Sequence, residues 1–366
     1  MAELRIEQLL REMVNRKASD LHLRVGVPPV YRINGALQRL FDVRVDSAMM
    51  DSFLDDIMNR DQKQRFEANK ECDFAVGARD IGRFRVNVFR QRGTIAVVIR
   101  HIKAVIPAFE ELHLPEIIRD LALTKRGLIL VTGTTGSGKS TTLASMIDYI
   151  NQKESVNVIT VEDPIEYLYK DNVAIISQRE IGVDTLSYAN ALRAALRQDP
   201  DVLLVGEIRD LETMQIALTA ADTGHMVFAT IHTTNAVETI HRVLSMYPPH
   251  QHDEIRLLLA EVLVGIISLR LLPTKDGKGR VPAAEILVNT GAIKEYIEDK
   301  NKLDMVEQAV AEGHIQYHSQ TFDQALLELY QNEQISLETA MNAATNRDDF
   351  DLKIRGISGT SDRSWT

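Results

Sequence analysis

A glycine-rich segment at residues 133–140, with the sequence GTTGSGKS, has the residue types and the spacing of a phosphate-binding loop. It matches the pattern G-x-x-x-x-G-K-[ST] in full, after an apolar strand-like run and before a helix-forming run. Glycines let successive backbone amides point at phosphate oxygens, and the helix N-terminus adds partial positive charge. We expect Lys139 to reach the β- and γ-phosphates of ATP, and the Ser140 hydroxyl to bind Mg²⁺. The residues predicted to bind the nucleotide are Gly133, Thr134, Thr135, Gly136, Ser137, Gly138, Lys139, Ser140 and Thr141.

Hydrolysis needs a carboxylate that orients or deprotonates a water beside the γ-phosphate, and we predict Glu207 as this general base. Four apolar residues at 202–205 predict a buried strand, and Glu207 follows its C-terminal end, where open α/β sheets place their ligands. An aspartate is usual immediately before such a glutamate, but Gly206 occupies that position. Magnesium must therefore find other acidic partners.

A second acidic pair, Glu162 and Asp163, follows another apolar strand in the segment VITVEDPIEY. We predict both residues as Mg²⁺ partners and also count Glu162 among the catalytic residues. A solvated turn or a helix cap is the alternative interpretation of this pair.

Two histidines flank an apolar strand in the segment GHMVFATIHT. His232 follows the strand on the same rim as Glu207, so we predict that it donates a hydrogen bond to the γ-phosphate. His225 precedes the strand, and a structural role for it is as well supported as a functional one. The predicted catalytic residues are thus Glu207, Lys139, Glu162 and His232.

The elements that position these residues fall into two domains. Residues 1–102 combine helical spacing with period-two apolar alternation, which predicts an α+β domain. Residues 103–115, in which Pro107 and Pro115 flank the sequence FEELHL, are the expected linker. From residue 116 to 350, short apolar runs alternate with helices and then give way to mostly helical sequence after Pro248, which predicts an α/β fold with a parallel sheet. The polar residues 351–366 are expected to form a disordered tail.

Composition narrows the classes of function. The net charge of −10 and the pI near 5.5 argue against nucleic acid as a partner, because nucleic-acid binding depends on neutralising phosphates. The apolar stretch 257–272 contains Glu261 and Arg270 and is shorter than the roughly 20 residues of a membrane helix. The N-terminus lacks the features of a signal peptide. We therefore expect a cytoplasmic protein.

Four segments together resemble the motifs of the type II and type IV secretion ATPases: GTTGSGKS, VEDPIEY, LRQDPDVLLVGEIRD and GHMVFATIHT. They correspond to the Walker A, Asp, atypical Walker B and His boxes, and Gly206 before Glu207 is the pattern of that family. Segments of residues 1–102 also resemble its N-terminal domain. The resemblance implies a PAS-like domain followed by a RecA-like P-loop ATPase domain, and homo-hexameric rings that bind ATP between the two domains.

Within that family the sequence is most similar to the pilus-retraction branch. It begins almost directly at the PAS-like domain and has no four-cysteine zinc insertion. Residues 291–304 resemble the retraction motif AIRNLIRE at Ala292, Ile293 and Ile297, with Lys294 replacing an arginine; an amphipathic surface helix is the alternative. The resemblance implies a motor for pilus retraction and twitching motility at the cytoplasmic face of the inner membrane. Its contact with the membrane would be indirect, through a pilus platform protein.

A hexamer must sense nucleotide from a neighbouring subunit, and arginine is suited to bind phosphate oxygens. We predict Arg85 and Arg100, at the ends of an expected hairpin, for such contacts. Arginines also serve solubility at strand edges, so that interpretation stays open.

Three further functions remain open, and one of them is a nucleotide-gated scaffold that scarcely hydrolyses ATP. An extension or secretion ATPase of the same family would use the same chemistry. A nucleic-acid motor is a rival from another class, although the acidic charge and the lack of a basic, aromatic-rich segment disfavour it.

Overall fold

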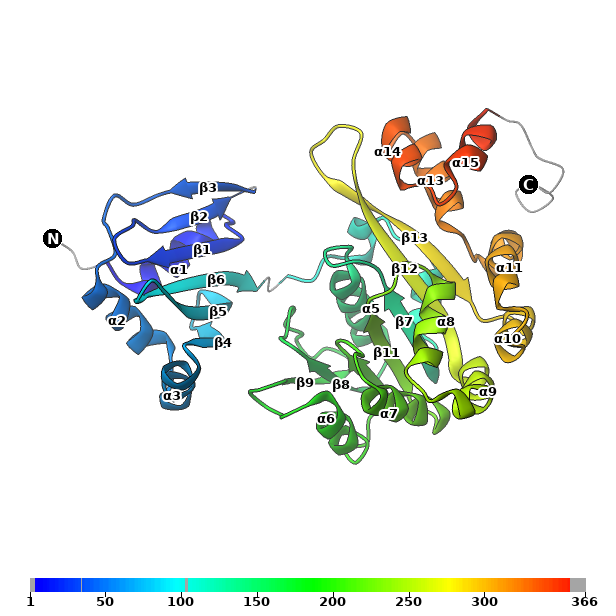
Figure 1. Ribbon diagram of the computed structural model, residues 1–366, viewed down its shortest axis with the longest axis horizontal. Helices are drawn as coiled ribbons and strands as arrows, with labels where there is room; N and C mark the ends of the chain where they lie inside the picture. The colour runs from blue at the N-terminus through cyan, green and yellow to red at the C-terminus, as the bar shows by residue number, and fades with distance from the viewer. Residues whose placement is uncertain (1–3, 34, 103–104, 356–366) are drawn as a thin grey trace. The chain divides into compact units, whose positions relative to one another are not determined.

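The structure is a computed structural model of the 366-residue chain and describes residues 4–33, 35–102 and 105–355 (Figure 1). The chain divides into two units. The first comprises the residues up to Val105 together with Glu166–Leu168, and the second comprises the others. Each unit is described by itself.

The first unit contains a six-stranded antiparallel sheet in the order β3-β2-β1-β6-β5-β4. Its elements are α1 (Ile6–Asn15), β1 (Asp20–Arg24), β2 (Val30–Ile33), β3 (Ala36–Arg39), α2 (Ser47–Ile57), α3 (Arg60–Asn69), β4 (Glu71–Ala78), β5 (Gly82–Gln91) and β6 (Thr94–Ile102). Apolar side chains from the helices and from alternate positions of the strands pack in one buried cluster. It includes Leu9, Met13, Phe53, Phe84 and Ile99. This is the α+β arrangement that the sequence predicts.

The helical sequence near residues 47–68 forms two helices, α2 and α3, instead of one continuous helix. Met58 is extended and ends α2, and the Asn59 side chain accepts a hydrogen bond from the Gln62 amide at the start of α3. The Gln62 side chain accepts one in return from the Asn59 amide. This reciprocal cap satisfies amides that a continuous helix would pair internally, so the chain turns here.

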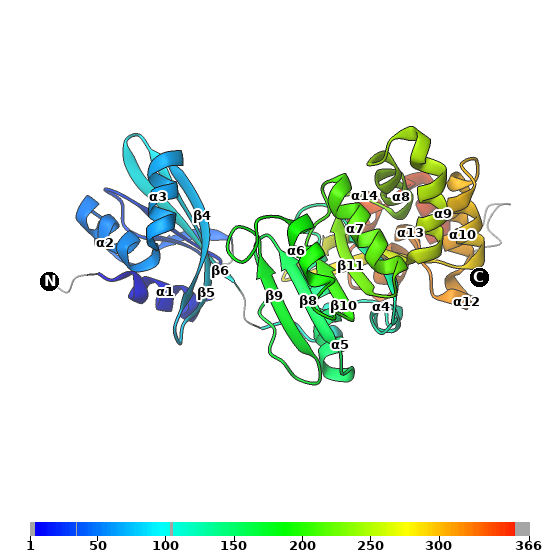
Figure 2. The same ribbon diagram turned by 90° about the horizontal axis from the view of Figure 1, so that it is seen from below.

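The second unit is built on a seven-stranded sheet in the order β13-β12-β7-β11-β10-β8-β9. All neighbouring strands are parallel except β12 and β13. The strands are β7 (Gly127–Thr132), β8 (Asn157–Glu162), β9 (Ile175–Glu180), β10 (Val202–Val205), β11 (Met226–Ile231), β12 (Leu263–Pro273) and β13 (Arg280–Val288). Figure 2 shows β9, β8, β10 and β11 side by side.

Helices cover this sheet and continue to the C-terminal side. They are η1 (Phe109–Leu112), α4 (Ile117–Ala122), α5 (Lys139–Lys153), α6 (Tyr188–Ala195), α7 (Leu211–Asp222), α8 (Ala236–Ser245), η2 (Pro249–Gln251), α9 (His252–Val262), α10 (Gly291–Glu298), η3 (Leu303–Met305), α11 (Val306–Glu312), α12 (His314–Tyr317), α13 (Phe322–Gln331), α14 (Leu337–Ala343) and α15 (Arg347–Ile354). The α/β fold class predicted from the sequence is confirmed.

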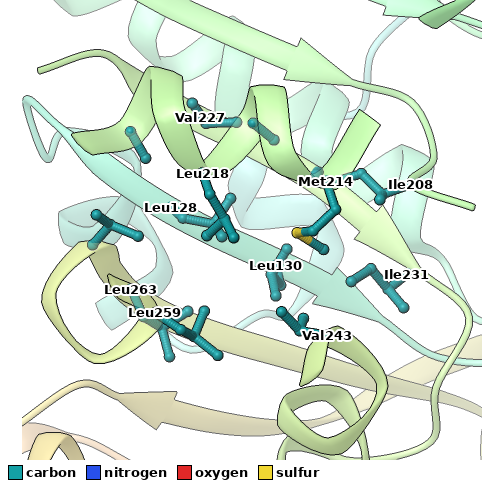
Figure 3. Close-up of a cluster of buried hydrophobic side chains, with 14 of the residues drawn as sticks. Leu128, Leu130, Ile208, Met214, Leu218, Val227, Ile231, Val243, Leu259 and Leu263 are labelled. Atoms are coloured by element: carbon teal, nitrogen blue, oxygen red, sulfur yellow. The ribbon is translucent and has the colours of Figure 1, made fainter. Parts of the chain in front are cut away.

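Successive residues of β7 face opposite sides of the sheet, as the pleat requires. Leu128 and Leu130 pack with α7, α8 and α9, where Leu218, Val243 and Leu259 surround them (Figure 3). Ile129 and Val131 belong to the other cluster, against α4 and α5. Burial on both faces explains why the strand is a continuous apolar run, and it fixes the point at which the loop at Gly133 begins.

The prediction of mostly helical sequence after Pro248 is wrong for residues 263–288, which form the antiparallel pair β12 and β13. The apolar stretch 257–272 divides between the end of α9 and β12. A strand buried on both faces shows no alternation, so its sequence is not distinguishable from a buried helix by periodicity. Strand β9 also lies outside the elements that we predicted.

The expected linker, residues 103–115, includes the short helix η1, whose Phe109 is buried. Helix α15 extends to Ile354, past the start of the expected tail, and residues 356–366 lie outside the described residues. Among the residues that the structure describes, no helix combines the length and the apolar character needed to cross a membrane.

The central position of β11 gives a test of the core. Phe228 is 0% exposed there, and Phe228→Ala should lower the free energy of unfolding by about 3–5 kcal/mol, because it leaves a cavity between sheet and helices. Leu186, 86% exposed, is the control, and Leu186→Ala should change the same quantity by less than about 0.5 kcal/mol. Denaturant unfolding measures both. Equal losses for the two variants would contradict this packing.

Candidate active site

The phosphate-binding loop lies between β7 and α5, as the sequence predicts. Gly133, Gly136 and Gly138 all have positive φ angles, which side-chain-bearing residues rarely adopt. A Cβ at Gly133 would lie 2.4 Å from the Ser137 Oγ and 2.5 Å from the Leu269 carbonyl oxygen. The glycine is therefore required by space as well as by conformation.

The Lys139 side chain is buried against this loop. Its ammonium donates hydrogen bonds to the carbonyl oxygens of Gly133, at 2.8 Å, and Thr134, at 3.0 Å. Ser140 and Thr141 follow it in the first turn of α5 and are half-buried. The Ser137 hydroxyl is buried and has no hydrogen-bond partner within the described ranges. A buried donor of this kind suits a loop that binds an anion.

A cavity of about 300 Å³ adjoins the loop. Ser137, Gly138 and Thr141 form one wall, and Leu271 and Arg280 contribute from β12 and β13. The remaining lining residues are Glu111, Leu112, Leu114, Thr142 and Pro282. Sequence reasoning missed Leu271 and Arg280, because it did not recognise the strands that carry them.

Strand order brings the other predicted residues to the same edge of the sheet. Strands β7, β11, β10 and β8 are consecutive and parallel, so their carboxyl ends coincide. The loop at Gly133 follows β7, His232 follows β11, Glu207 follows β10, and Glu162 ends β8. Residues far apart in the sequence therefore meet at one edge, where parallel sheets bind their ligands.

A side chain at Gly206, such as the aspartate that is usual at its position, would be tightly packed against β8. A Cβ there would lie 3.1 Å from the Val161 carbonyl oxygen and 3.2 Å from the Glu162 Cα. The Gly206 amide donates to the Val161 carbonyl at 2.8 Å, and its own carbonyl accepts from the Thr230 hydroxyl at 2.5 Å. Backbone pairing thus continues beyond β10 and fixes where the Glu207 side chain starts.

The Glu207 carboxylate has two basic side chains as neighbours. Arg209 Nη2 lies 2.5 Å from Oε2, and His232 Nε2 lies 3.3 Å from Oε1. Burial raises the pKa of Glu207, but the Arg209 hydrogen bond and the charges of His232, Arg209 and Lys139 outweigh it, so the pKa lies below its ordinary value. The carboxylate is therefore ionised at neutral pH. Sequence reasoning gave Arg209 no role, although it stands two residues after Glu207.

The structure separates the two histidines. His232 is beside Glu207, and its side chain is 45% exposed. His225 precedes β11, at the opposite end of the strand, where its Nδ1 lies 2.9 Å from the Ala220 carbonyl and 3.2 Å from the Thr223 hydroxyl. His225 therefore closes the turn after α7, at the end of β11 opposite to Glu207, and these contacts favour the structural role.

Glu162 and Asp163 differ in their surroundings. Glu162 Oε1 accepts hydrogen bonds from the Thr160 hydroxyl at 2.7 Å and from the Gln178 amide at 3.1 Å. Asp163 is exposed. Gln178 lies on β9, the strand that the sequence did not reveal, so this support for Glu162 was not predictable.

Arg85 and Arg100 belong to the first unit, where they lie directly opposite each other on β5 and β6. Arg100 Nε donates to Asp20 Oδ1 at 2.9 Å, and Arg85 Nε lies 3.9 Å from Asp73 Oδ1. All four side chains line a cavity of about 200 Å³. The pair is therefore held by carboxylates on one face of that sheet.

The residues of the expected retraction motif lie on α10. Ile293 and Ile297 are buried in the core of the second unit, whereas Ala292 is exposed. Lys294 Nζ lies 3.1 Å from Glu261 Oε2 on α9. The two isoleucines are thus packing residues, and Ala292 is the exposed position of the motif.

A phosphate-binding loop beside an ionised carboxylate, at the carboxyl edge of a parallel sheet, defines the class of P-loop ATPases. A family model described as "Type II/IV secretion system protein" matches residues 1–355. The chain belongs to this family, and it is an ATP hydrolase.

Individual relatives give a finer comparison. Type IV pilus ATPase PilU of Pseudomonas aeruginosa is 41% identical over 355 residues, which cover 96% of this chain and 92% of that protein. Type IV pilus retractation ATPase PilT of the same organism is 41% identical over 345 residues, covering 94% and 99%. A crystal structure of the pilus retraction motor PilT with bound ADP matches with a TM-score of 0.89 and 47% identity, over 95% of this chain and 99% of that one. The predicted similarity to the retraction branch is confirmed.

Arg209 gives a test of the electrostatics at Glu207. Arg209→Ala removes the hydrogen bond that keeps the pKa of Glu207 low, so the pKa should rise. Because the predicted role of Glu207 in hydrolysis requires an ionised carboxylate, the acidic limb of kcat/KM for ATP should move to higher pH. Steady-state rates across pH measure this shift.

Arg193 is the matched control, because it pairs with Glu212 on exposed parts of α6 and α7. Arg193→Ala should leave the acidic limb in place. An unmoved limb in Arg209→Ala would contradict the proposed charge balance.

Proposed function

We propose that the chain hydrolyses ATP by in-line attack of a water that Glu207 positions, and that it uses this reaction as a homo-hexameric motor for type IV pilus retraction. The observation that carries the chemistry is the presence of Glu207 at the same sheet edge as the Gly133–Ser140 loop. The similarity to PilT supports the motor function.

Each residue of the loop has a role in this proposal. Backbone amides of Gly133–Thr141 bind the phosphates, and Lys139 exchanges its two carbonyl partners for phosphate oxygens. The cavity beside Ser137 and Thr141 is large enough for part of the nucleoside, with Leu271 as an apolar wall. Arg280 lies at the same cavity and is available to the ribose or phosphates.

The donor set fits Mg²⁺. No cluster of three or more acidic, histidine or cysteine side chains that could hold a metal occurs within the ranges that the structure describes. Mg²⁺ usually takes few protein ligands and keeps waters and substrate phosphates, so the Ser140 hydroxyl suffices as a direct ligand, with Glu162 and Asp163 binding its waters. When bound, the ion neutralises charge on the phosphates.

The low pKa of Glu207 decides how it acts. A carboxylate that is a weak base contributes more by orienting the attacking water than by removing its proton early. His232 lies 3.3 Å from Glu207 and can donate a hydrogen bond to the γ-phosphate. It would thereby hold that phosphate in position beside the water that Glu207 orients. The chain's cationic groups then stabilise the charge that develops in the transition state.

In a hexameric motor, further residues would act at subunit contacts and in retraction. Arg85 and Arg100 reach the nucleotide of a neighbouring subunit, and a change of nucleotide alters these contacts. The exposed face of α10, with Ala292 and Lys294, serves retraction. The ring acts from the cytoplasmic face of the inner membrane on a pilus platform protein.

Two variants separate binding from hydrolysis. Glu207→Gln should lower kcat for ATP by about 10²–10⁴-fold while ATP still binds, because the amide keeps the shape but loses the charge. Lys139→Ala should abolish binding itself. Phosphate release and nucleotide titration measure the two effects. Unchanged turnover in Glu207→Gln would contradict the assigned role.

Deletion of the gene distinguishes a motor that retracts pili from one that extends them. Loss of retraction with surplus pili is the expected result, and complementation with the Glu207→Gln variant should fail to restore retraction. Cells without pili would instead assign the chain to extension.

A further inference from the structure

A buried carboxylate that is not among the proposed catalytic residues is hydrogen-bonded to segments that carry them. Glu285 lies on β13, directly opposite Ser268 on β12, and is 5% exposed. The Ser268 hydroxyl hydrogen-bonds to this carboxylate. The Thr132 hydroxyl, at the end of β7, in turn donates to Ser268 Oγ at 3.0 Å. A chain of hydroxyls therefore joins Glu285 to the residue that precedes Gly133.

The carboxylate also holds the start of helix α8. Glu285 Oε2 accepts a hydrogen bond from the Ala236 amide at 3.1 Å. Ala236 is the first residue of α8, and only the segment 233–235 separates it from His232. That segment is itself tied to α8, since the Thr233 and Thr239 hydroxyls lie 2.7 Å apart and the Thr234 amide donates to Glu238. The helix and the loop after His232 therefore move together.

These contacts converge on one side chain. Through Ser268, Glu285 is linked to the strand that leads into the phosphate loop, and through Ala236 it is linked to the helix that follows His232. Buried hydrogen bonds to a charged group are among the stronger ones in proteins, and they hold their partners in place.

We propose that Glu285 is a positioning residue for ATP hydrolysis, which sets the position of His232 relative to the phosphate loop by holding Ala236 and Ser268 at once. This inference rests on the proposed roles of His232 and Glu207. Glu285 itself touches neither substrate nor water in this account.

The surroundings of Glu285 make its charge adjustable. Burial raises its pKa to about 7, and Glu307 on α11 adds to the rise, while the Ala236 hydrogen bond opposes it. Arg270 on β12 also faces the carboxyl. The carboxyl lines a cavity of about 460 Å³, whose other ionisable residues are Glu238, His241, Asp304 and Glu307. A protonated carboxyl donates to Ser268 instead of accepting from it, so the hydroxyl chain to Thr132 changes with protonation.

The first test compares turnover in the full-length chain. Glu285→Gln and Ser268→Ala should each lower kcat for ATP about tenfold and change KM by less than about twofold, because the nucleotide-binding residues stay in place. Gln320→Leu is the matched control. Gln320 is also buried, and its side chain donates a hydrogen bond to the carbonyl of Ala284, which precedes Glu285 on β13. It is not one of the residues that hydrogen-bond to the Glu285 carboxylate. It should leave kcat unchanged.

The ratio of wild-type to Glu285→Gln kcat across pH gives a second readout that a merely structural role would not move. The ratio should be largest above pH 7 and approach one towards pH 6, since protonated Glu285 resembles glutamine in charge. A ratio that does not depend on pH would contradict the proposal.

Thermal unfolding distinguishes a positioning role from loss of stability. Folding raises the pKa of Glu285 to about 7. The free energy of unfolding of the wild-type protein therefore falls as pH rises from the pKa of this carboxyl in the unfolded chain towards about 7. Glutamine carries no such charge, so the Tm of Glu285→Gln minus that of wild type should increase between pH 5 and pH 8. A less active variant that gains relative stability would support the proposal.

Besides a kcat ratio that does not depend on pH, three results would overturn it: kcat of Glu285→Gln within twofold of wild type, an equal loss of kcat in Gln320→Leu, or a Tm difference that does not change with pH. Glu207→Gln, measured in parallel, tests the underlying chemistry. If Glu207→Gln loses turnover and Glu285→Gln does not, only the positioning role fails; if Glu207→Gln retains turnover, the proposed function fails first.

Discussion

The site depends on the close approach of two backbone segments at Gly206. A side chain there would crowd Val161 and Glu162, and with glycine β10 and β8 remain paired up to their carboxyl ends. Because that pairing persists, Glu207 and Glu162 leave the sheet at the same edge, next to the loop that begins at Gly133. The absence of the aspartate fits this close packing, and the acidic groups that we propose to serve Mg²⁺ come from the neighbouring strand.

Charge balance at this edge follows from the same geometry. Glu207 is an acid among the basic side chains of Lys139, Arg209 and His232, and their combined effect on its pKa outweighs that of its burial. A site already arranged in this way needs little reorganisation when the triphosphate arrives, which is the usual origin of electrostatic catalysis. The proposed role of Glu285 extends the arrangement, because it fixes the helix beyond His232 from the far edge of the sheet.

Much of this was predictable from the sequence, for identifiable reasons. The loop at Gly133, the strand before Glu207 and the position of His232 each depend on local spacing, so their motifs predicted them. The contacts of Arg209 and Gln178 with the two acids depend on how strand ends meet, which no local pattern reports. Glu285 was not predicted for a second reason: β12 and β13 are largely apolar strands with most positions buried, which periodicity does not separate from helices. Its carboxylate then looked like an ordinary charge within a helical region.

A structure of the full chain with Mg²⁺ and a non-hydrolysable ATP analogue would show whether Glu207 positions the attacking water. In that complex, we expect Lys139 to leave the carbonyls of Gly133 and Thr134 for the γ-phosphate. We also expect that His232 contacts that phosphate, and that a water bound to Glu207 lies in line with the scissile bond. A γ-phosphate whose nearest carboxylate is not Glu207, or a water in line that is held by another residue, would contradict this role of Glu207.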